Sequence, residues 1–213
     1  MAAFKNAEGK QILLGVVKAI QENKAYLGDV DGLIGDGDHG MNMNKGFTIF
    51  ARRIADKAVY FTEGLNELGT ILMTEIGGSM GPIYGTIFMD MAESGENLEE
   101  ISLPDFTGML ESGLNGLYGI VDARVGDKTL VDTLCPAVES LKASAAAGKD
   151  FSTALDEMEK AAADGMNSTK DMISKFGRSS RLGERSRGVL DVGSVSCQII
   201  LSAMTDGIRE VLL

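Results

Sequence analysis

The sequence predicts an all-α fold of about eight helices, and three observations support this prediction. Apolar residues recur at spacings of three and four along nearly the whole chain, which is typical of the buried face of an amphipathic helix. Between these stripes there is no convincing alternating or Val/Ile/Thr-rich run of the kind that marks a strand. The chain has no tryptophan, 3 prolines and 12 methionines among its 213 residues, a profile that favours helices.

Each predicted helix is defined by one apolar stripe. The first four stripes span residues 12–20, 43–54, 65–76 and 83–91. The third stops at Gly77, as helices commonly do, and Pro82 suits the first turn of the fourth. The last four stripes span residues 106–117, 130–141, 151–162 and 195–204, and the seventh helix could extend to Phe176. No linker or repeat separates the stripes, so we expect residues 1–213 to form a single domain.

Composition and charge narrow the class of protein. Twenty basic and thirty-one acidic residues give a net charge of −11, and such a surface repels nucleic acid and anionic membranes, so we expect neither as a partner. No apolar run reaches the roughly 18–20 residues of a membrane span, and the N-terminus lacks the apolar segment of a signal peptide. Cys135 and Cys197 lie within apolar helical patterns, as reduced core thiols do. We therefore expect a cytoplasmic protein.

Four segments break the helical period and are rich in glycine or charge. They span residues 28–40, 77–82, 123–128 and 177–193. Because loops on a rigid scaffold often carry function, we expect the functional residues here.

The first segment contains GDGDHG (residues 35–40), which fits the G-x-G-x-x-G spelling of a dinucleotide-binding loop. That motif must follow a strand, and none is predicted here; the P-loop and EF-hand templates also fail. The interspersed glycines allow Asp31, Asp36 and Asp38 to converge, and carboxylates so close favour a hard divalent cation. Mg²⁺ is typically shared between carboxylates and nucleotide phosphates, so the pattern predicts a magnesium site that binds phosphate. The alternative is an acidic loop in which Asp38 only caps the helix over residues 41–54.

Two neighbours of these aspartates are candidates for ligand contacts. His39 is the only histidine of the chain, and its position inside the acidic loop favours a nucleotide contact, although a lone histidine is more often a packing or capping residue. Asn42, at the start of the same helix, could reach ligand oxygens.

The other three segments have their own chemistry. The GGSMGP run (residues 77–82) ends one helix and begins another, where free N–H groups could bind an anion or a purine edge. In GDKTL (residues 126–130), we expect Asp127 to cap the following helix. The last segment holds four arginines within ten residues, which favour either phosphate recognition or a solvated basic loop paired with the acidic surface. These are Arg178, Arg181, Arg185 and Arg187.

Together, four stretches resemble the nucleotide-binding (DhaL) subunits of bacterial dihydroxyacetone kinases. The stretches are IGDGDHGMNMNKGF, GGSMGPIYGT, GDKTLVDTLCPAVESL and GRSSRLGERSRG, in the family's order. The resemblance implies an eight-helix antiparallel barrel whose loops at one end hold ADP or ATP through two Mg²⁺ ions. It implies that Asp31, Asp36 and Asp38 ligate the metals and that Leu130 packs on the adenine. The residues implied to contact or lie near the nucleotide are His39, Asn42, Ser79, Met80, Arg178, Asp191 and Gly193, the last two in a closing loop.

The resemblance also implies partners. In that family a separate DhaK-like subunit holds the ketone through a histidine, and a DhaM-like phosphocarrier subunit rephosphorylates the bound ADP. The chain would then be a phosphotransferase subunit that supplies positioning and charge neutralisation but no catalytic side chain. Two alternatives are open: a regulatory subunit that contacts a transcription regulator, or a kinase subunit for another acceptor, such as a related ketose or a fatty acid. His39 argues against the fatty-acid class, which typically has threonine at this position.

Three positions depart from the family pattern. A proline before the last helix is replaced by Val192, a common histidine by Val189, and a serine by Met80. The metal-binding aspartates are intact, so we expect nucleotide binding to be retained.

Overall fold

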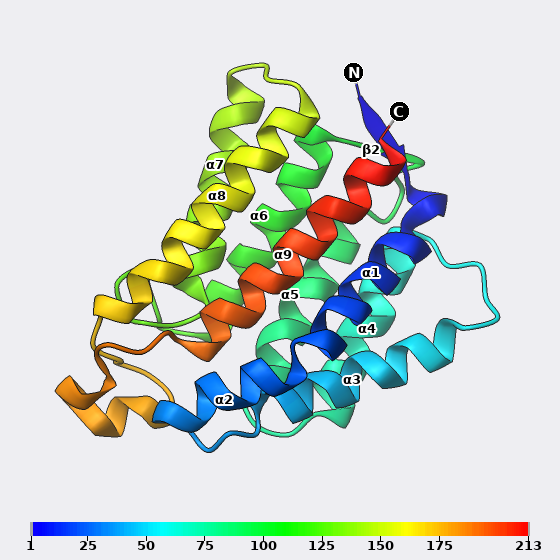
Figure 1. Cartoon of the computed structure of the whole chain (residues 1–213). Helices are drawn as coiled ribbons and strands as arrows, with labels where there is room; N and C mark the ends of the chain where they lie inside the picture. The colour runs from blue at the N-terminus through cyan, green and yellow to red at the C-terminus, as the bar shows by residue number, and fades with distance from the viewer. Residues whose placement is uncertain (1, 213) are drawn as a thin grey trace.

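The computed structural model describes residues 2–212, which fold into nine α-helices with two very short strands (Figure 1). The first five helices are α1 (Gly9–Glu22), α2 (Lys24–Ile34), α3 (His39–Ile54), α4 (Phe61–Glu75) and α5 (Met80–Ser94). The last four are α6 (Leu103–Ile120), α7 (Val131–Ala146), α8 (Phe151–Ser168) and α9 (Val192–Val211). The all-α prediction is confirmed.

Eight of these helices form a closed ring. The order around the ring is α1, α3, α4, α5, α6, α7, α8 and α9, and α9 packs against α1 to complete it. These eight helices correspond to the eight predicted stripes. The ninth, α2, lies outside the ring, and the sequence analysis wrongly read residues 28–34 as loop. Only Leu27, Val30 and Asp31 of α2 are buried, so it has no apolar stripe long enough to reveal a helix.

Two further differences concern short elements. Strand β1 (Ala3–Lys5) pairs antiparallel with β2 (Glu100–Ser102), with Phe4 opposite Ile101; three residues are too few to show alternation. The seventh predicted helix ends at Ser168 rather than reaching Phe176. It is followed by the 3₁₀ turn η2 (Thr169–Asp171) and, after residues 172–177, by η3 (Arg178–Ser186). A further 3₁₀ turn, η1 (Asn6–Glu8), precedes α1.

The ring encloses a core of aliphatic and phenylalanine side chains. Phe47, Phe50 and Phe106 are fully buried, and Phe106 lies 6.0 Å from Phe151 between ring centroids. Cys197 is buried in this core, whereas Cys135 is only half-buried, and both thiols are free. No helix within residues 2–212 is both long and apolar enough to cross a membrane.

The up-and-down topology places alternate connections at the same end of the ring. The α2–α3, α4–α5, α6–α7 and α8–α9 connections meet at one end, together with α2 (Figure 1). The α3–α4, α5–α6 and α7–α8 connections lie at the other end, beside β1 and β2. All four segments that the sequence analysis singled out therefore converge, although about 150 residues separate the first from the last.

Candidate functional site

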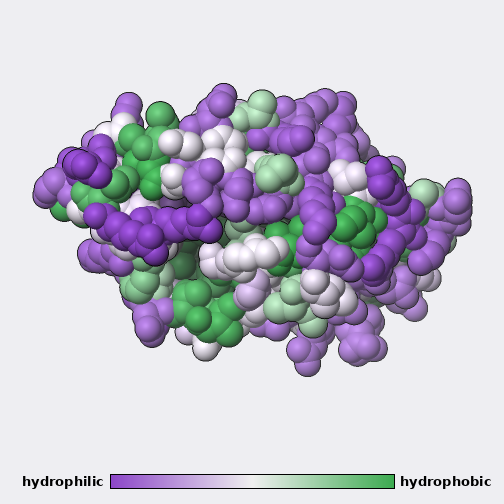
Figure 2. Space-filling view, turned by 90° about the horizontal axis from the view of Figure 1, so that it is seen from below, coloured by the Kyte–Doolittle hydropathy of each residue, from purple (hydrophilic) through white to green (hydrophobic). Residues whose placement is uncertain are grey.

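A cavity of about 400 Å³ opens where the four connections converge. This volume is within the range of small-molecule sites. Viewed from this end, the surface is hollowed, with hydrophilic residues along one side of the recess and hydrophobic residues along the other (Figure 2). The cavity is lined by all the nucleotide-site and metal-site candidates except Asn42, which lies half-buried in the first turn of α3.

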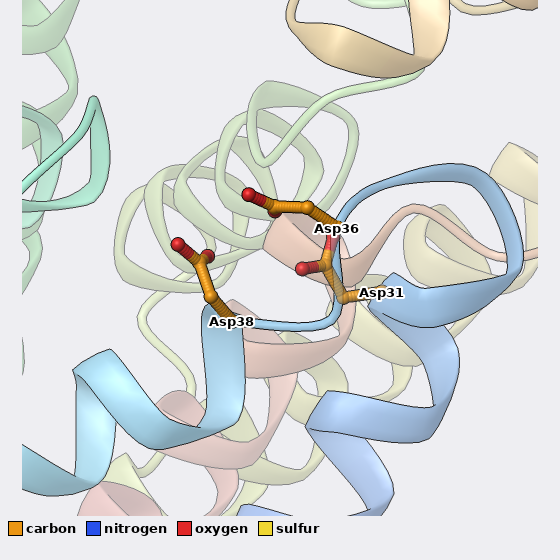
Figure 3. A group of neighbouring side chains, drawn as sticks. All are labelled: Asp31, Asp36 and Asp38. Carbon is orange, nitrogen blue, oxygen red and sulfur yellow. The ribbon is translucent and has the colours of Figure 1, made fainter.

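Three carboxylates form the acidic edge of the cavity. Asp31 lies on α2, Asp36 in the connection and Asp38 just before α3, and their carboxylates gather on one side of the chain (Figure 3). One oxygen of each lies within 4.8 Å of the others. Asp31 is buried, and its Oδ2 accepts a hydrogen bond from the backbone N–H of His39 (3.3 Å).

Gly35 explains how the buried carboxylate fits beneath the connection. A Cβ at this position would lie 2.1 Å from Oδ1 of Asp31, so any side chain would displace the carboxylate. Two oxygens that bind one Mg²⁺ lie at most about 4.2 Å apart, which is twice the usual Mg–O distance. The spacing of the three carboxylates therefore fits one ion if the carboxylates move slightly closer together, or two ions that share the carboxylates. The donor set of three carboxylates suits a hard cation such as Mg²⁺.

The alternative in which Asp38 only caps α3 is wrong, and so is the prediction that Asp127 caps α7. Asp38 stands before α3 but makes no capping hydrogen bond with its side chain. The carboxylate of Asp127 accepts instead from the backbone N–H of Arg124 (2.7 Å) and from Nζ of Lys175 (2.6 Å), and these bonds lower its pKa. Asp132, in the first turn of α7, orders this connection by accepting from the N–H groups of Gly126 (2.6 Å) and Thr129 (2.7 Å).

His39 is held by a buried hydrogen-bond network at the cavity wall. Its Nε2 lies 2.9 Å from Oγ of Ser196 on α9, and that hydroxyl lies 2.6 Å from the hydroxyl of Tyr84 on α5. The Tyr84 hydroxyl also donates to the carbonyl oxygen of Gly193 (3.2 Å). Burial lowers the pKa of His39 to about 4, so the imidazole is neutral at neutral pH. The network joins three helices at the cavity; the predicted nucleotide contact of His39 stays a prediction.

Apolar side chains form the opposite wall. Leu117 and Val121 contribute from the end of α6, and Leu130 and Val131 from the start of α7. Leu130 is buried at 5% exposure. Ser79 and Met80 complete the rim at the beginning of α5, where free backbone N–H groups are expected.

The α8–α9 connection carries the arginines. Arg178 and Asp36 form an ion pair across the mouth of the cavity. Arg187 does not pair with the three aspartates of the acidic edge. It bonds Glu184 and the carbonyl oxygen of Asp171 instead. Of the four arginines, only Arg178 lines the cavity.

Asp191 and Gly193 line the cavity but do not lie in a loop, as the sequence analysis expected. Asp191 is the N-cap of α9, where its Oδ2 accepts from the N–H of Ser194 (2.7 Å), and Gly193 lies in the first turn. Burial raises the pKa of Asp191 to about 6. Three further residues were not predicted from the sequence: Lys128 and Tyr84, which also line the cavity, and Ser196, which bonds His39 and Tyr84 behind its wall. Lys128 is 1% exposed, and no local pattern predicts a buried lysine.

The comparisons with known proteins agree with this geometry. The model of the DAK2 domain family matches residues 33–206, so the chain belongs to that family. Over 188 residues the chain is 35% identical to the ADP-binding subunit DhaL of the PEP-dependent dihydroxyacetone kinase of Escherichia coli, covering 87% of this chain and 89% of that protein. It is equally similar, at 35% identity over 189 residues, to the ADP-binding subunit DhaL of the PTS-dependent kinase of Lactococcus lactis, covering 88% of this chain and 90% of that protein.

Solved structures share the fold. The dihydroxyacetone kinase of C. freundii superposes with a TM-score of 0.71 at 21% identity, over 92% of this chain and 33% of that one. Its complex with AMP-PNP and Mg²⁺ gives a TM-score of 0.69 over 94% of this chain and 34% of that one. The predicted helical barrel is confirmed.

Proposed function

We propose that the chain is the nucleotide-binding subunit of a dihydroxyacetone kinase and binds ADP or ATP with two Mg²⁺ ions. The observation that carries the proposal is the two-sided cavity, with three carboxylates at one edge and an apolar wall at the other. A nucleotide has the same two sides. Its base is flat and apolar, and its phosphate chain is anionic, so cations are needed between the phosphates and the carboxylates. The near full-length similarity to ADP-binding subunits supports the same conclusion.

The residues of the site have different roles. Asp31, Asp36 and Asp38 hold the Mg²⁺ ions, which when bound neutralise the charge of the transferred phosphoryl group. Leu130 packs on the adenine, and Ser79, Met80, His39 and Asn42 contact the nucleotide. Arg178 binds a phosphate group, and Asp191 with Gly193 shapes the wall beside it. The chain itself contributes positioning and the exclusion of water, so we assign no catalytic residue to it.

The proposal includes a place in a larger assembly. A DhaM-like phosphocarrier subunit rephosphorylates the bound ADP, and the phosphoryl group then passes to dihydroxyacetone held on a DhaK-like subunit. Residues 1–213 form a single domain that works in the cytoplasm. A regulatory role through a transcription regulator, or another acceptor such as a ketose or a fatty acid, is not favoured, because the relatives that match over nearly nine tenths of both chains are ADP-binding subunits of dihydroxyacetone kinases.

Calorimetric titration with ADP tests the binding step. The purified protein is first stripped of nucleotide and then titrated in Mg²⁺ and, separately, in EDTA. We expect binding in Mg²⁺ and none in EDTA, because the carboxylates repel phosphate without a cation. Absence of binding in Mg²⁺ would refute the nucleotide site.

Reconstitution tests the assembly. The chain is mixed with the substrate-binding and phosphocarrier subunits of the same source, the general phosphotransferase proteins, phosphoenolpyruvate and dihydroxyacetone. We expect dihydroxyacetone phosphate to form only when all components are present. Product formation without this chain would contradict its role.

A further inference from the structure

The connection between α8 and α9 covers one side of the cavity. We call residues 169–190 the strap. Its middle places Phe176, Gly177, Arg178 and Ser179 on the cavity lining. The strap contributes little to the core, since the only buried residue of η3 is Ser186. Something other than apolar packing must therefore hold it in place.

Backbone hydrogen bonds close the base of the strap. The N–H of Gly188 donates to the carbonyl oxygen of Lys170 (2.7 Å), and the N–H of Asp191 donates to Oγ1 of Thr169 (3.0 Å). Gly177, Gly183 and Gly188 have positive φ angles, of 68°, 54° and 90°, so the chain turns sharply at three points of the strap. The two ends of the strap thus lie side by side.

Lys128 joins these two ends from outside the strap. Its Nζ donates to the carbonyl oxygen of Thr169 (2.7 Å), where the strap begins, and to that of Val189, where it ends. The ammonium is buried, and its desolvation lowers the pKa of Lys128. A buried cation that donates to two carbonyls forms charge-assisted bonds, which are stronger than neutral ones.

The backbone around Lys128 is built for this contact. Lys128 has a φ of 61° and is the sole non-glycine residue with positive φ within residues 2–212. The neighbouring residue Asp127 also binds the strap, at Lys175. The carbonyl oxygen of Asp127 accepts from the N–H of Lys175 (3.1 Å), and the carboxylate of Asp127 accepts from the Lys175 ammonium. The turn of residues 126–128 therefore holds both the beginning and the end of the strap.

We infer that Lys128 is a positioning residue that holds the strap closed over the cavity and thereby slows the release of bound nucleotide. This inference rests on the proposed function and adds to it the feature that determines whether ADP is retained or exchanged. Lys128 acts through the strap, since the two bonds of its ammonium go to strap carbonyls rather than to a ligand.

The substitution Lys128→Met tests the inference, with Lys10→Met as a matched control. Lys10 also donates to two backbone carbonyls, those of Ala55 and Lys57, both at 2.7 Å, but it lies at the opposite end of the ring. A third variant, Lys175→Met, removes only the half-buried bond between the Lys175 ammonium and Asp127. That variant keeps the buried core untouched, so it remains informative if Lys128→Met folds poorly.

The first measurement uses the protein without nucleotide. Trypsin cuts after arginine, and the strap holds four arginines, so mass spectrometry of the fragments reports how often the strap opens. We expect cleavage within residues 178–187 to become roughly tenfold faster or more in Lys128→Met, as the loss of charge-assisted bonds implies. Lys175→Met should give a smaller increase, and Lys10→Met none. Unchanged strap cleavage in both Lys128→Met and Lys175→Met would overturn the inference.

The second measurement is the release rate of a fluorescent Mg·ADP analogue, chased with excess ADP in a stopped-flow instrument. We expect release to become faster in Lys128→Met by a similar factor and to be unchanged in Lys10→Met. Faster strap cleavage with unchanged release would overturn the link to retention. If the wild-type protein binds no Mg·ADP, the proposed function and the retention role both fail, whereas the cleavage result still decides whether Lys128 holds the strap.

Discussion

The two ends of the helical ring are built on different principles. At the cavity end, the connections are rich in glycine and charge and are tied mainly by polar contacts such as those of Lys128 and Asp132, and the α6–α7 and α8–α9 connections are long. At the other end they are short and well capped: Ser102 and Asp105 form a capping box at α6, and Asp150 caps α8. A single ring can thus separate the residues that stabilise the fold from those that bind a ligand.

Asn6 illustrates how the end of the ring opposite the cavity, here called the far end, is held together. It is 2% exposed, and its amide donates to Oγ1 of Thr62 (3.1 Å) and to the carbonyl oxygen of Leu98 (2.7 Å). Its Oδ1 accepts from the N–H of Thr62 (3.1 Å). One side chain therefore joins the N-terminal segment, α4 and the α5–α6 connection. If the two ends are independent, a substitution at the far end should lower stability without changing nucleotide affinity. A substitution at the cavity end should change affinity without lowering stability.

The largest effect on binding should come from Asp36→Asn. The change removes one proposed Mg²⁺ ligand and also relieves repulsion among the three carboxylates. It breaks the exposed ion pair with Arg178, which contributes at most about 1 kcal/mol. We expect the stability of the protein without ligand to hold or rise and the thermal shift with Mg·ADP to vanish. A wild-type thermal shift in the variant would show that Asp36 is not a ligand.

Asn6→Ala should produce the largest loss of stability. The change leaves Thr62 and Leu98 with unpaired buried groups, at a cost of about 2–4 kcal/mol in the free energy of unfolding. Urea unfolding without ligand measures this loss. Calorimetry should give the wild-type affinity for Mg·ADP, because Asn6 does not contact the cavity end. A parallel loss of affinity would show that the two ends are coupled.

An intermediate effect is expected for Arg178. An arginine that binds a nucleotide phosphate contributes roughly 1.5–3 kcal/mol, so Arg178→Ala should weaken Mg·ADP binding about ten- to more than a hundredfold. Arg178→Lys keeps the charge but loses the planar fork of the guanidinium, so its affinity for Mg·ADP should lie between those of wild type and Arg178→Ala. Titrations at one ionic strength compare the three. Equal affinities would mean that Arg178 only pairs with Asp36.

The smallest effect is expected at the far end, for Glu157→Gln. The Lys149 ammonium and the Ser144 hydroxyl lower the pKa of Glu157 below its ordinary value. A carboxylate with a lowered pKa in the folded protein stabilises it above the unfolded pKa, and this stabilisation is lost as the pH falls through the folded pKa. The variant should therefore melt slightly below wild type at pH 7 and together with it at pH 3. A difference that persists at pH 3 would point to packing rather than charge.

The sequence predicted the eight ring helices because each has an apolar stripe of more than two turns. It did not predict α2, because an aspartate, Asp31, occupies one of its few buried positions. The acidic cluster was predictable because its members lie within eight residues and glycines separate them. Residues 177–190 of the strap were predicted to be non-helical, whereas the residues before them were read as a possible extension of the seventh helix to Phe176. The 3₁₀ turns η2 and η3 were not predicted, because they lack a periodic signal.

Long-range contacts explain the remaining differences. His39 and Ser196 are 157 residues apart, and nothing near either one announces their hydrogen bond. Lys128 was not singled out within GDKTL, because a lysine in a polar sequence is normally exposed. Only the fold brings the carbonyls of Thr169 and Val189 to its ammonium. Asn42 shows the converse, since proximity in sequence to the aspartates did not place it on the cavity lining.

An even number of antiparallel passes has a practical consequence. The eight ring helices return the chain to the end from which it started, so β1 and the last turn of α9 lie near each other, opposite the cavity (Figure 1). A biotin tag or a fluorophore attached at either terminus would therefore stand far from the mouth of the cavity. Protein immobilised in this way on a sensor surface would present the open cavity to the solution, so that partner subunits could reach it without steric interference from the support.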